Sequence, residues 1–141
     1  MTFTAGYEFA WAARQHGERE AVIFNDQRLS FAEVNRRGNR LANAMIDLGL
    51  DRDHRVAVLL NNCLESLDTV IGAAKAGVHY VSLNARYPAA EQRKILEDAE
   101  PTIIIAGPEF EDVISAAVEG LDCIKAVYGI GWSHGDTEDY P

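Results

Sequence analysis

The chain of 141 residues contains 13 Lys and Arg residues against 22 Asp and Glu residues, so its net charge is −9. A surplus of negative charge repels phosphate backbones, which argues against nucleic acid as a partner. Hydrophobic residues make up 48 % of the sequence and charged residues 25 %, which favours a globular domain over a disordered chain, and no stretch reaches the roughly 18 consecutive apolar residues of a membrane-spanning helix.

The first part of the chain predicts a small hairpin between two helices. Ser30 precedes Glu33 by three positions, the spacing of a capping box, so a long helix is expected to begin there. Gly49 can adopt the left-handed conformation that ends a helix. The expected elements are a short helix within residues 4–16, a hairpin formed by residues 21–24 and 28–31, and a helix that ends near Leu48.

The second part of the chain alternates strands and helices. Residues 55–60 (RVAVLL) are almost continuously apolar, as in a strand covered on both faces, and residues 79–83, beginning at His79, are expected to form a second buried strand. Further strands are expected at residues 102–106 and 123–128, with helices at residues 64–76, 89–99 and between Pro108 and Gly120. The alternation predicts an α/β fold, a doubly wound and mostly parallel sheet of about four strands, with the small hairpin N-terminal to it.

The last residues differ in composition from the rest of the chain. Residues 129–141 (GIGWSHGDTEDYP) are rich in Gly and acidic residues and lack hydrophobic periodicity. We therefore expect one α/β domain over residues 1–128, followed by a linker or disordered tail over residues 129–141.

Two stretches of the sequence resemble a known family. Residues 28–50 read RLSFAEVNRRGNRLANAMIDLGL, and residues 69–98 read TVIGAAKAGVHYVSLNARYPAAEQRKILED. These two sequences are similar to the opening segment of the adenylate-forming (AMP-binding) enzymes, and most similar to that of the acyl-CoA synthetases and fatty-acid-CoA ligases. The resemblance covers about residues 21–106. It implies the first subdomain of the adenylate-forming fold.

The resemblance also implies an activity for the intact enzyme. Such enzymes join a carboxylic acid to AMP with ATP and Mg²⁺, and then transfer the acyl group to coenzyme A. The phosphate-binding loop and catalytic lysine segment of the family do not occur in the 141 residues. We therefore expect this segment to be an inactive scaffold that binds none of these cofactors alone, has no catalytic residue, and has the remainder of a ligase chain as its partner.

The loop that follows residues 79–83 carries the candidate site. Asn84, Arg86 and Tyr87 would lie at the carboxyl edge of the sheet, where open α/β sheets bind ligands. In the family that the chain resembles, the matching loop lies toward the acyl or CoA channel. The Arg86 guanidinium could bind a phosphate or carboxylate. In the competing structural interpretation, Tyr87 packs against the helix start and Arg86 pairs with an acid such as Glu91.

The asparagine, histidine and cysteine residues bear on whether the chain has a metal site and on its location in the cell. Asn61 and Asn62 are explained by turn formation, and the four histidines have no partners at metal-ligand spacing, so no metal site is expected. Cys63 and Cys123 are isolated, which together with the absence of a signal-peptide pattern favours a cytoplasmic location. A freestanding binding module with the same fold stays open as the alternative function.

One further expectation concerns association. An isolated first subdomain would retain the apolar face that packs against the remainder of the ligase. Covering such a face by two-fold pairing is the commonest solution, so the isolated chain is expected to form a homodimer.

Overall fold

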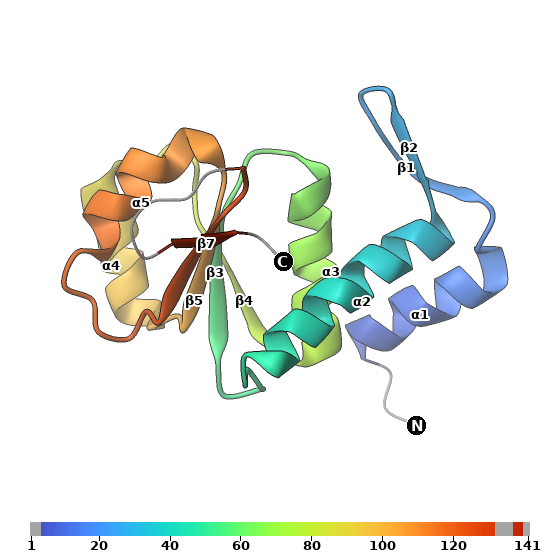
Figure 1. Ribbon diagram of the computed structural model, residues 1–141, viewed down its shortest axis with the longest axis horizontal. Helices are drawn as coiled ribbons and strands as arrows, with labels where there is room; N and C mark the ends of the chain where they lie inside the picture. Colours follow the sequence, from blue (N-terminus) through green and yellow to red (C-terminus); the bar gives the residue numbers. More distant parts are fainter. Residues whose placement is uncertain (1–3, 132–136, 140–141) are drawn as a thin grey trace. The chain divides into compact units, whose positions relative to one another are not determined.

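The computed structural model describes residues 4–131 and 137–139, which form two compact units (Figure 1). The first, here the helical unit, comprises the described residues up to Asp53 together with residues 63–78. The second, here the sheet unit, comprises residues 54–62 and the described residues from His79 onward. Among the described residues, no helix is both long enough and apolar enough to cross a membrane.

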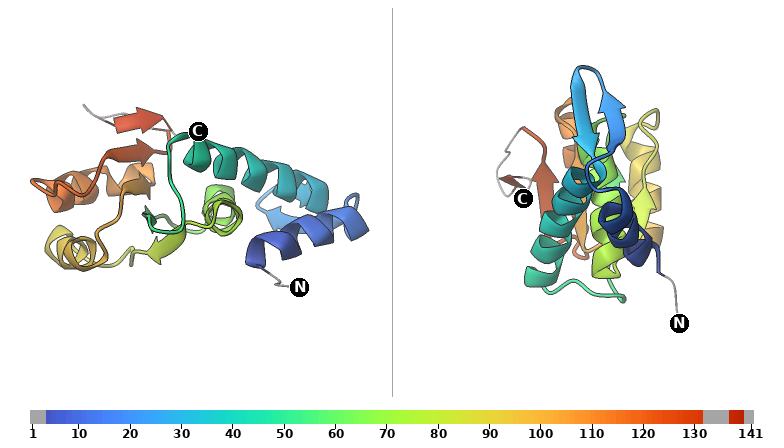
Figure 2. Two further views of the ribbon diagram at one scale, coloured as in Figure 1. Left: turned by 90° about the horizontal axis from the view of Figure 1, so that it is seen from below. Right: turned by 90° about the vertical axis from the view of Figure 1, so that its right-hand side faces the viewer.

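The helical unit contains three helices and a hairpin. Its elements are α1 (Ala5–His16), β1 (Glu20–Phe24), β2 (Gln27–Ser30), α2 (Phe31–Asp47) and α3 (Leu64–Ala76). The strands β1 and β2 pair antiparallel, as expected. The three helices contact one another, and the hairpin extends from the N-terminal end of α2 (Figure 2).

The predicted capping box begins α2. The Ser30 hydroxyl accepts a hydrogen bond from the Glu33 backbone N–H at 3.3 Å, and the Glu33 carboxylate accepts one from the Ser30 backbone N–H at 2.7 Å. These two bonds satisfy backbone donors that the first helical turn leaves free. The Ser30 backbone N–H, which donates to the Glu33 carboxylate, and next the Ser30 hydroxyl favour the ionised form, and so they lower the pKa of Glu33 below its ordinary value.

Close helix packing holds α2 against α3. Gly38 of α2 is buried, and a Cβ at this position would overlap Cγ2 of the fully buried Ile71 on α3. Arg37, directly before Gly38, donates hydrogen bonds from its guanidinium to the Asp68 carboxylate of α3, from Nε at 2.9 Å and from Nη2 at 2.6 Å. The lack of a side chain at Gly38 and the bidentate ion pair beside it therefore hold α2 close to α3.

The sheet unit contains one parallel sheet with the strand order β4-β3-β5-β6-β7. Its elements are β3 (Arg55–Leu59), β4 (His79–Ser82), α4 (Ala89–Ala99), β5 (Ile103–Ala106), the 3₁₀ turn η1 (Pro108–Phe110), α5 (Glu111–Val118), β6 (Ala126–Gly129) and β7 (Thr137–Asp139). Every adjacent pair in it is parallel. The predicted α/β class and parallel sheet are confirmed.

One face of this sheet packs against α4 and α5. Ala57 and Leu59 of β3 and Ile104 of β5 are buried with Leu96 of α4 and Ile114 of α5 in a single apolar cluster. The two helices lie side by side on one side of the strands (Figure 1). The residues that alternate with these along the strands, Val56, Val58 and Ile105, are buried as well. Burial on both faces explains why the sequence of these strands is almost continuously apolar.

Two expectations about the strands are wrong. His79 begins β4, as expected, but it is exposed, as are Tyr80 and Ser82, because β4 lies at the edge of the sheet and pairs only with β3. The fourth predicted strand begins at Ala126 instead of residue 123, since residues 121–124 form a turn in which the Ile124 N–H reaches the Leu121 carbonyl.

Regular structure continues into the segment expected to be a linker. Gly129 is the last residue of β6, and Thr137–Asp139 form β7 beside it, which makes the sheet five-stranded. The expected tail over residues 129–141 therefore includes strand residues. The domain boundary at residue 128 stays a prediction, and residues 132–136 and 140–141 lie outside the described part.

Candidate functional site at the carboxyl edge of the sheet

The carboxyl ends of the strands in the sheet unit meet at one edge. Ala106 at the end of β5 pairs with Leu59 at the end of β3 and with Gly129 at the end of β6, and Ser82 of β4 pairs with Val58. The loops that follow these strands therefore emerge side by side. In open α/β sheets this edge is where ligands bind.

The loop of residues 84–87, which follows β4, has a defined conformation. The Asn84 side-chain Oδ1 accepts a hydrogen bond from the Arg86 backbone N–H at 2.9 Å, and the Asn84 carbonyl accepts one from the Tyr87 backbone N–H at 3.0 Å. This is the Asx-turn geometry that asparagine favours. All three predicted site residues, Asn84, Arg86 and Tyr87, are exposed, and Tyr87 exposes 45 % of its surface.

The Arg86 side chain belongs to this loop and is exposed to solvent. Within the part of the chain that the structure describes, its guanidinium makes neither a hydrogen bond nor an ion pair. The competing interpretation pairs Arg86 with an acid such as Glu91; in the structure Glu91 instead accepts from Lys94 at 2.8 Å on the same helix. A planar guanidinium with unused donors is suited to a phosphate or carboxylate ligand.

Sequence reasoning missed the residue that supports this loop. Gln92, in the first turns of α4, is completely buried, and its Nε2 donates to the Asn84 carbonyl at 2.6 Å and to the Tyr87 carbonyl at 3.3 Å. Its Oε1 has no hydrogen-bonding partner among the described residues. A buried acceptor without a partner costs about 1–3 kcal/mol, which is comparable with what two neutral hydrogen bonds contribute.

A signal for Gln92 was present in the sequence. Leu96 follows it by four positions and is also fully buried, so both side chains lie on the same face of α4. A glutamine at a position where the helical period requires an apolar residue is unusual, because buried polar groups need partners.

The neighbouring loops are also joined by a polar contact. The Asn61 side-chain amide, after β3, donates to the Glu109 carboxylate, after β5, at 2.5 Å. Gly107 makes room for this arrangement, since a Cβ there would lie 2.7 Å from Glu109 Oε2. Turn formation alone therefore does not account for Asn61. Among the described residues, no group of three or more His, Cys, Asp or Glu side chains is placed to hold a metal ion.

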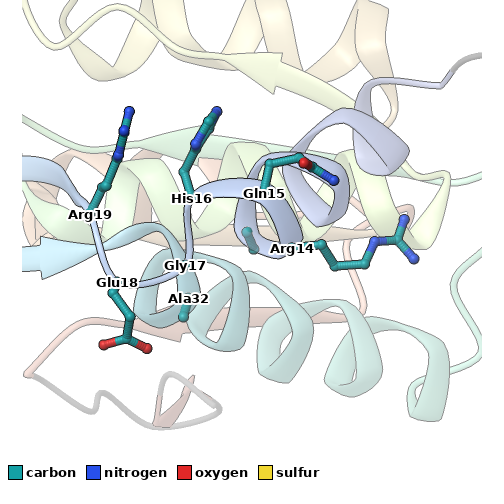
Figure 3. A pocket seen from close by; sticks show the side chains of 8 residues that line it. Arg14, Gln15, His16, Gly17, Glu18, Arg19 and Ala32 are labelled. Atoms are coloured by element: carbon teal, nitrogen blue, oxygen red, sulfur yellow. The ribbon is translucent and has the colours of Figure 1, made fainter.

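A hollow in the helical unit offers a less suitable site. It lies where α1 ends and is lined by Ala13, Arg14, Gln15, His16, Gly17, Glu18, Arg19 and Ala32. In Figure 3 the side chains of Arg19 and His16 extend in one direction, Glu18 extends in the opposite direction, and Arg14 points away from all three. Because these polar groups do not converge, the hollow lacks the geometry of a ligand site.

Comparison with known proteins identifies the family. The sequence model described as "AMP-binding enzyme" matches residues 9–137. The chain belongs to the AMP-binding enzyme family. The resemblance read from residues 21–106 is thereby confirmed, and the match extends beyond it at both ends.

Similar proteins include both peptide synthases and CoA ligases. The chain is 31 % identical over 133 residues to surfactin synthase subunit 1 of Bacillus subtilis (strain 168), which covers 93 % of this chain and 4 % of that protein. It is 26 % identical over 123 residues to a medium/long-chain-fatty-acid–CoA/3-oxocholest-4-en-26-oate–CoA ligase of Mycobacterium tuberculosis, covering 87 % of this chain and 22 % of the ligase.

Solved structures agree with this assignment. A fatty acyl CoA synthetase of Mycobacterium tuberculosis superimposes with a TM-score of 0.85 at 28 % sequence identity, covering 91 % of this chain and 26 % of the synthetase. The chain thus spans less than a quarter of the two curated relatives named above and about a quarter of this solved structure.

Proposed function

We propose that the chain forms the N-terminal α/β portion of a ligase that activates a carboxylic acid with ATP and Mg²⁺ and transfers the acyl group to coenzyme A. Membership of the AMP-binding enzyme family supports this proposal, as do the CoA ligases among the similar proteins. A fatty acid is the proposed acyl substrate, and the remainder of the ligase chain is the proposed partner. The proposed location is the cytoplasm, which the two free cysteines favour.

Within this ligase we propose that Asn84, Arg86 and Tyr87 line the path of the acyl substrate or of CoA. The observation that carries this proposal is the exposed Arg86 guanidinium, which no described residue engages at the carboxyl edge of the sheet. Both CoA phosphates and a substrate carboxylate offer paired oxygens to such a group. The Asn84 turn fixes the backbone from which the guanidinium extends.

The test of this site uses the complete ligase and two substitutions of Arg86. Arg86→Ala is expected to raise KM for CoA or for the acid by about tenfold or more, because a hydrogen bond to a charged group contributes about 1.5–3 kcal/mol. Arg86→Lys keeps the charge but loses the fork, so it should recover only part of the loss. The melting temperature should not change, since no described residue of the chain engages this side chain.

A matched control separates a local effect from loss of surface charge. Arg36 is exposed on α2 in the helical unit, and Arg36→Ala removes the same charge from a different unit of the chain. Its kinetics should match those of the unmodified enzyme. Unchanged KM values for Arg86→Ala, or an equal effect of Arg36→Ala, would contradict the proposed channel role.

The ligase proposal itself is tested by substrate-dependent pyrophosphate release. The complete protein should release pyrophosphate with fatty acids and form acyl-CoA, whereas a peptide-synthase activity would instead use amino acids without free CoA. The 141-residue chain alone should show no release, because the groups that stabilise the transferring phosphate are expected elsewhere. No release by the complete protein with either substrate class would favour a freestanding binding module.

We also propose that the isolated chain forms a homodimer. The described surface includes large apolar side chains that a monomer would leave in water, such as Trp11, which is 49 % exposed, and Ile46, which is 53 % exposed. Sedimentation equilibrium over micromolar concentrations should give the mass of two chains. A monomeric mass at every concentration would refute this proposal.

A further inference from the structure

Gln92 connects the core of the sheet unit with the loop of residues 84–87. Its side chain is fully buried, and its one amide nitrogen reaches the carbonyls of both Asn84 and Tyr87, the first and last residues of that loop. Arg86 lies between these two anchor points. The loop backbone is therefore held from inside the protein as well as by its own Asx turn.

The chemistry of Gln92 is unusual for a residue whose purpose is packing. Leu96, one turn after Gln92 on the same helix, belongs to an apolar cluster of buried residues. A leucine or methionine at residue 92 would fill a similar volume without leaving a buried Oε1 unpartnered. An amide at this position is therefore explained by what its N–H groups hold and not by the space that it fills.

We propose that Gln92 is a positioning residue that sets the conformation of the 84–87 loop and thereby the direction of the Arg86 guanidinium. The inference deepens the proposed role of this loop, and it rests on that role for its functional meaning. The structural part of the proposal does not depend on that role. When the Gln92 N–H groups are removed, the loop should lose order while the core keeps its stability.

The experiment compares Gln92→Met with Leu96→Met in the 141-residue chain. Gln92→Met keeps the side-chain length and removes both donated hydrogen bonds and the unpartnered acceptor. Leu96→Met changes shape at a fully buried position of the same helix without touching the loop. Backbone order parameters from ¹⁵N relaxation report the loop, and the thermal unfolding midpoint reports the core. If Gln92→Met does not fold, Gln92→Leu provides the same comparison.

The expected result is selective. In Gln92→Met the order parameters of the Arg86 and Tyr87 amides should fall from about 0.85 to below about 0.6, while those of Ala57 and Ile104 stay near the rigid value. The midpoint should shift by less than about 4 °C. Leu96→Met should leave the loop order parameters unchanged.

Two results would overturn the proposal. One is an ordered loop in Gln92→Met, and the other is a midpoint loss with equal loosening of strands and loop, which would make Gln92 an ordinary packing residue. Neither measurement involves a ligand. A failure of the proposed channel, seen as unchanged KM values for Arg86→Ala, can therefore be told apart from a failure of this inference.

Discussion

Replacing Gly38 by alanine tests whether close approach of α2 and α3 holds the helical unit together. The added methyl group would overlap Cγ2 of Ile71 and lie 3.0 Å from its Cβ. Ile71 is completely buried and β-branched, and such a residue has one strongly preferred χ1 rotamer in a helix. The side chain therefore has little freedom to move aside, so the helices must separate.

The magnitude follows from two opposing effects. Inserting a methylene into a packed core costs about 1–3 kcal/mol, and the rigidity of Ile71 places this contact near the upper end. Replacing glycine by alanine in a helix interior returns about 1 kcal/mol. The expected net result is a loss of about 1–2 kcal/mol in the free energy of unfolding, although alanine is the better helix former.

Urea denaturation followed by circular dichroism measures this loss. Asn39→Ala, at an exposed position of the same helix, supplies the control and should stabilise by about 0.6 kcal/mol through helix propensity alone. In an Ile71→Ala background, which removes Cγ2, Gly38→Ala should become neutral or stabilising. A Gly38→Ala protein that is more stable than the unmodified chain would refute the close-packing argument.

Two further predictions concern charged groups of the helical unit. The pKa of Glu33 is lowered by its bonds to Ser30, so its contribution to stability is present above its unfolded pKa, near 4.5, and is lost as the pH falls through the lower folded value. In urea unfolding at several acidic pH values, the free energy of unfolding should fall more steeply with decreasing pH for the unmodified chain than for Glu33→Gln. Identical dependence on pH in the two proteins would contradict the capping role. Arg37→Met should cost about 1.5–3 kcal/mol, because it leaves the Asp68 carboxylate, only 5 % exposed, without its bidentate donor. The double variant Arg37→Met with Asp68→Leu should recover most of this loss in thermal unfolding, and no recovery would show that the pair does not act through charge burial.

Local signals in the sequence were sufficient for most element boundaries. The helices at residues 64–76 and 89–99 were predicted with the bounds that the structure has. Gly77 ends α3 in the left-handed conformation, with φ at 77°, and the capping box of Ser30 and Glu33 begins α2. These features depend on residues a few positions apart, so the sequence displays them directly.

The exposure of the strands could not be predicted in the same way. Residues 79–83 looked like a buried strand because they follow an apolar helix and contain Tyr80, Val81 and Leu83. In the fold, β4 occupies the edge of the sheet, beside β3 alone. Apolar content shows that a strand has neighbours, but the order of parallel strands is decided by crossovers between distant segments.

The candidate site was likewise predicted in part from the sequence and decided in part by the tertiary structure. The sequence by itself determined the family, the α/β fold and the position of Asn84, Arg86 and Tyr87 after a strand. These depend on the local pattern of apolar and polar residues and on sequence similarity. Only the tertiary structure decided that Glu91 pairs with Lys94 and that no described residue forms an ion pair with Arg86, that Gln92 holds the loop from beneath, and that Asn61 reaches Glu109. Asn61 and Glu109 are 48 positions apart, and they meet because β3 and β5 are paired in parallel, so that the loops after both strands leave the sheet at the same edge.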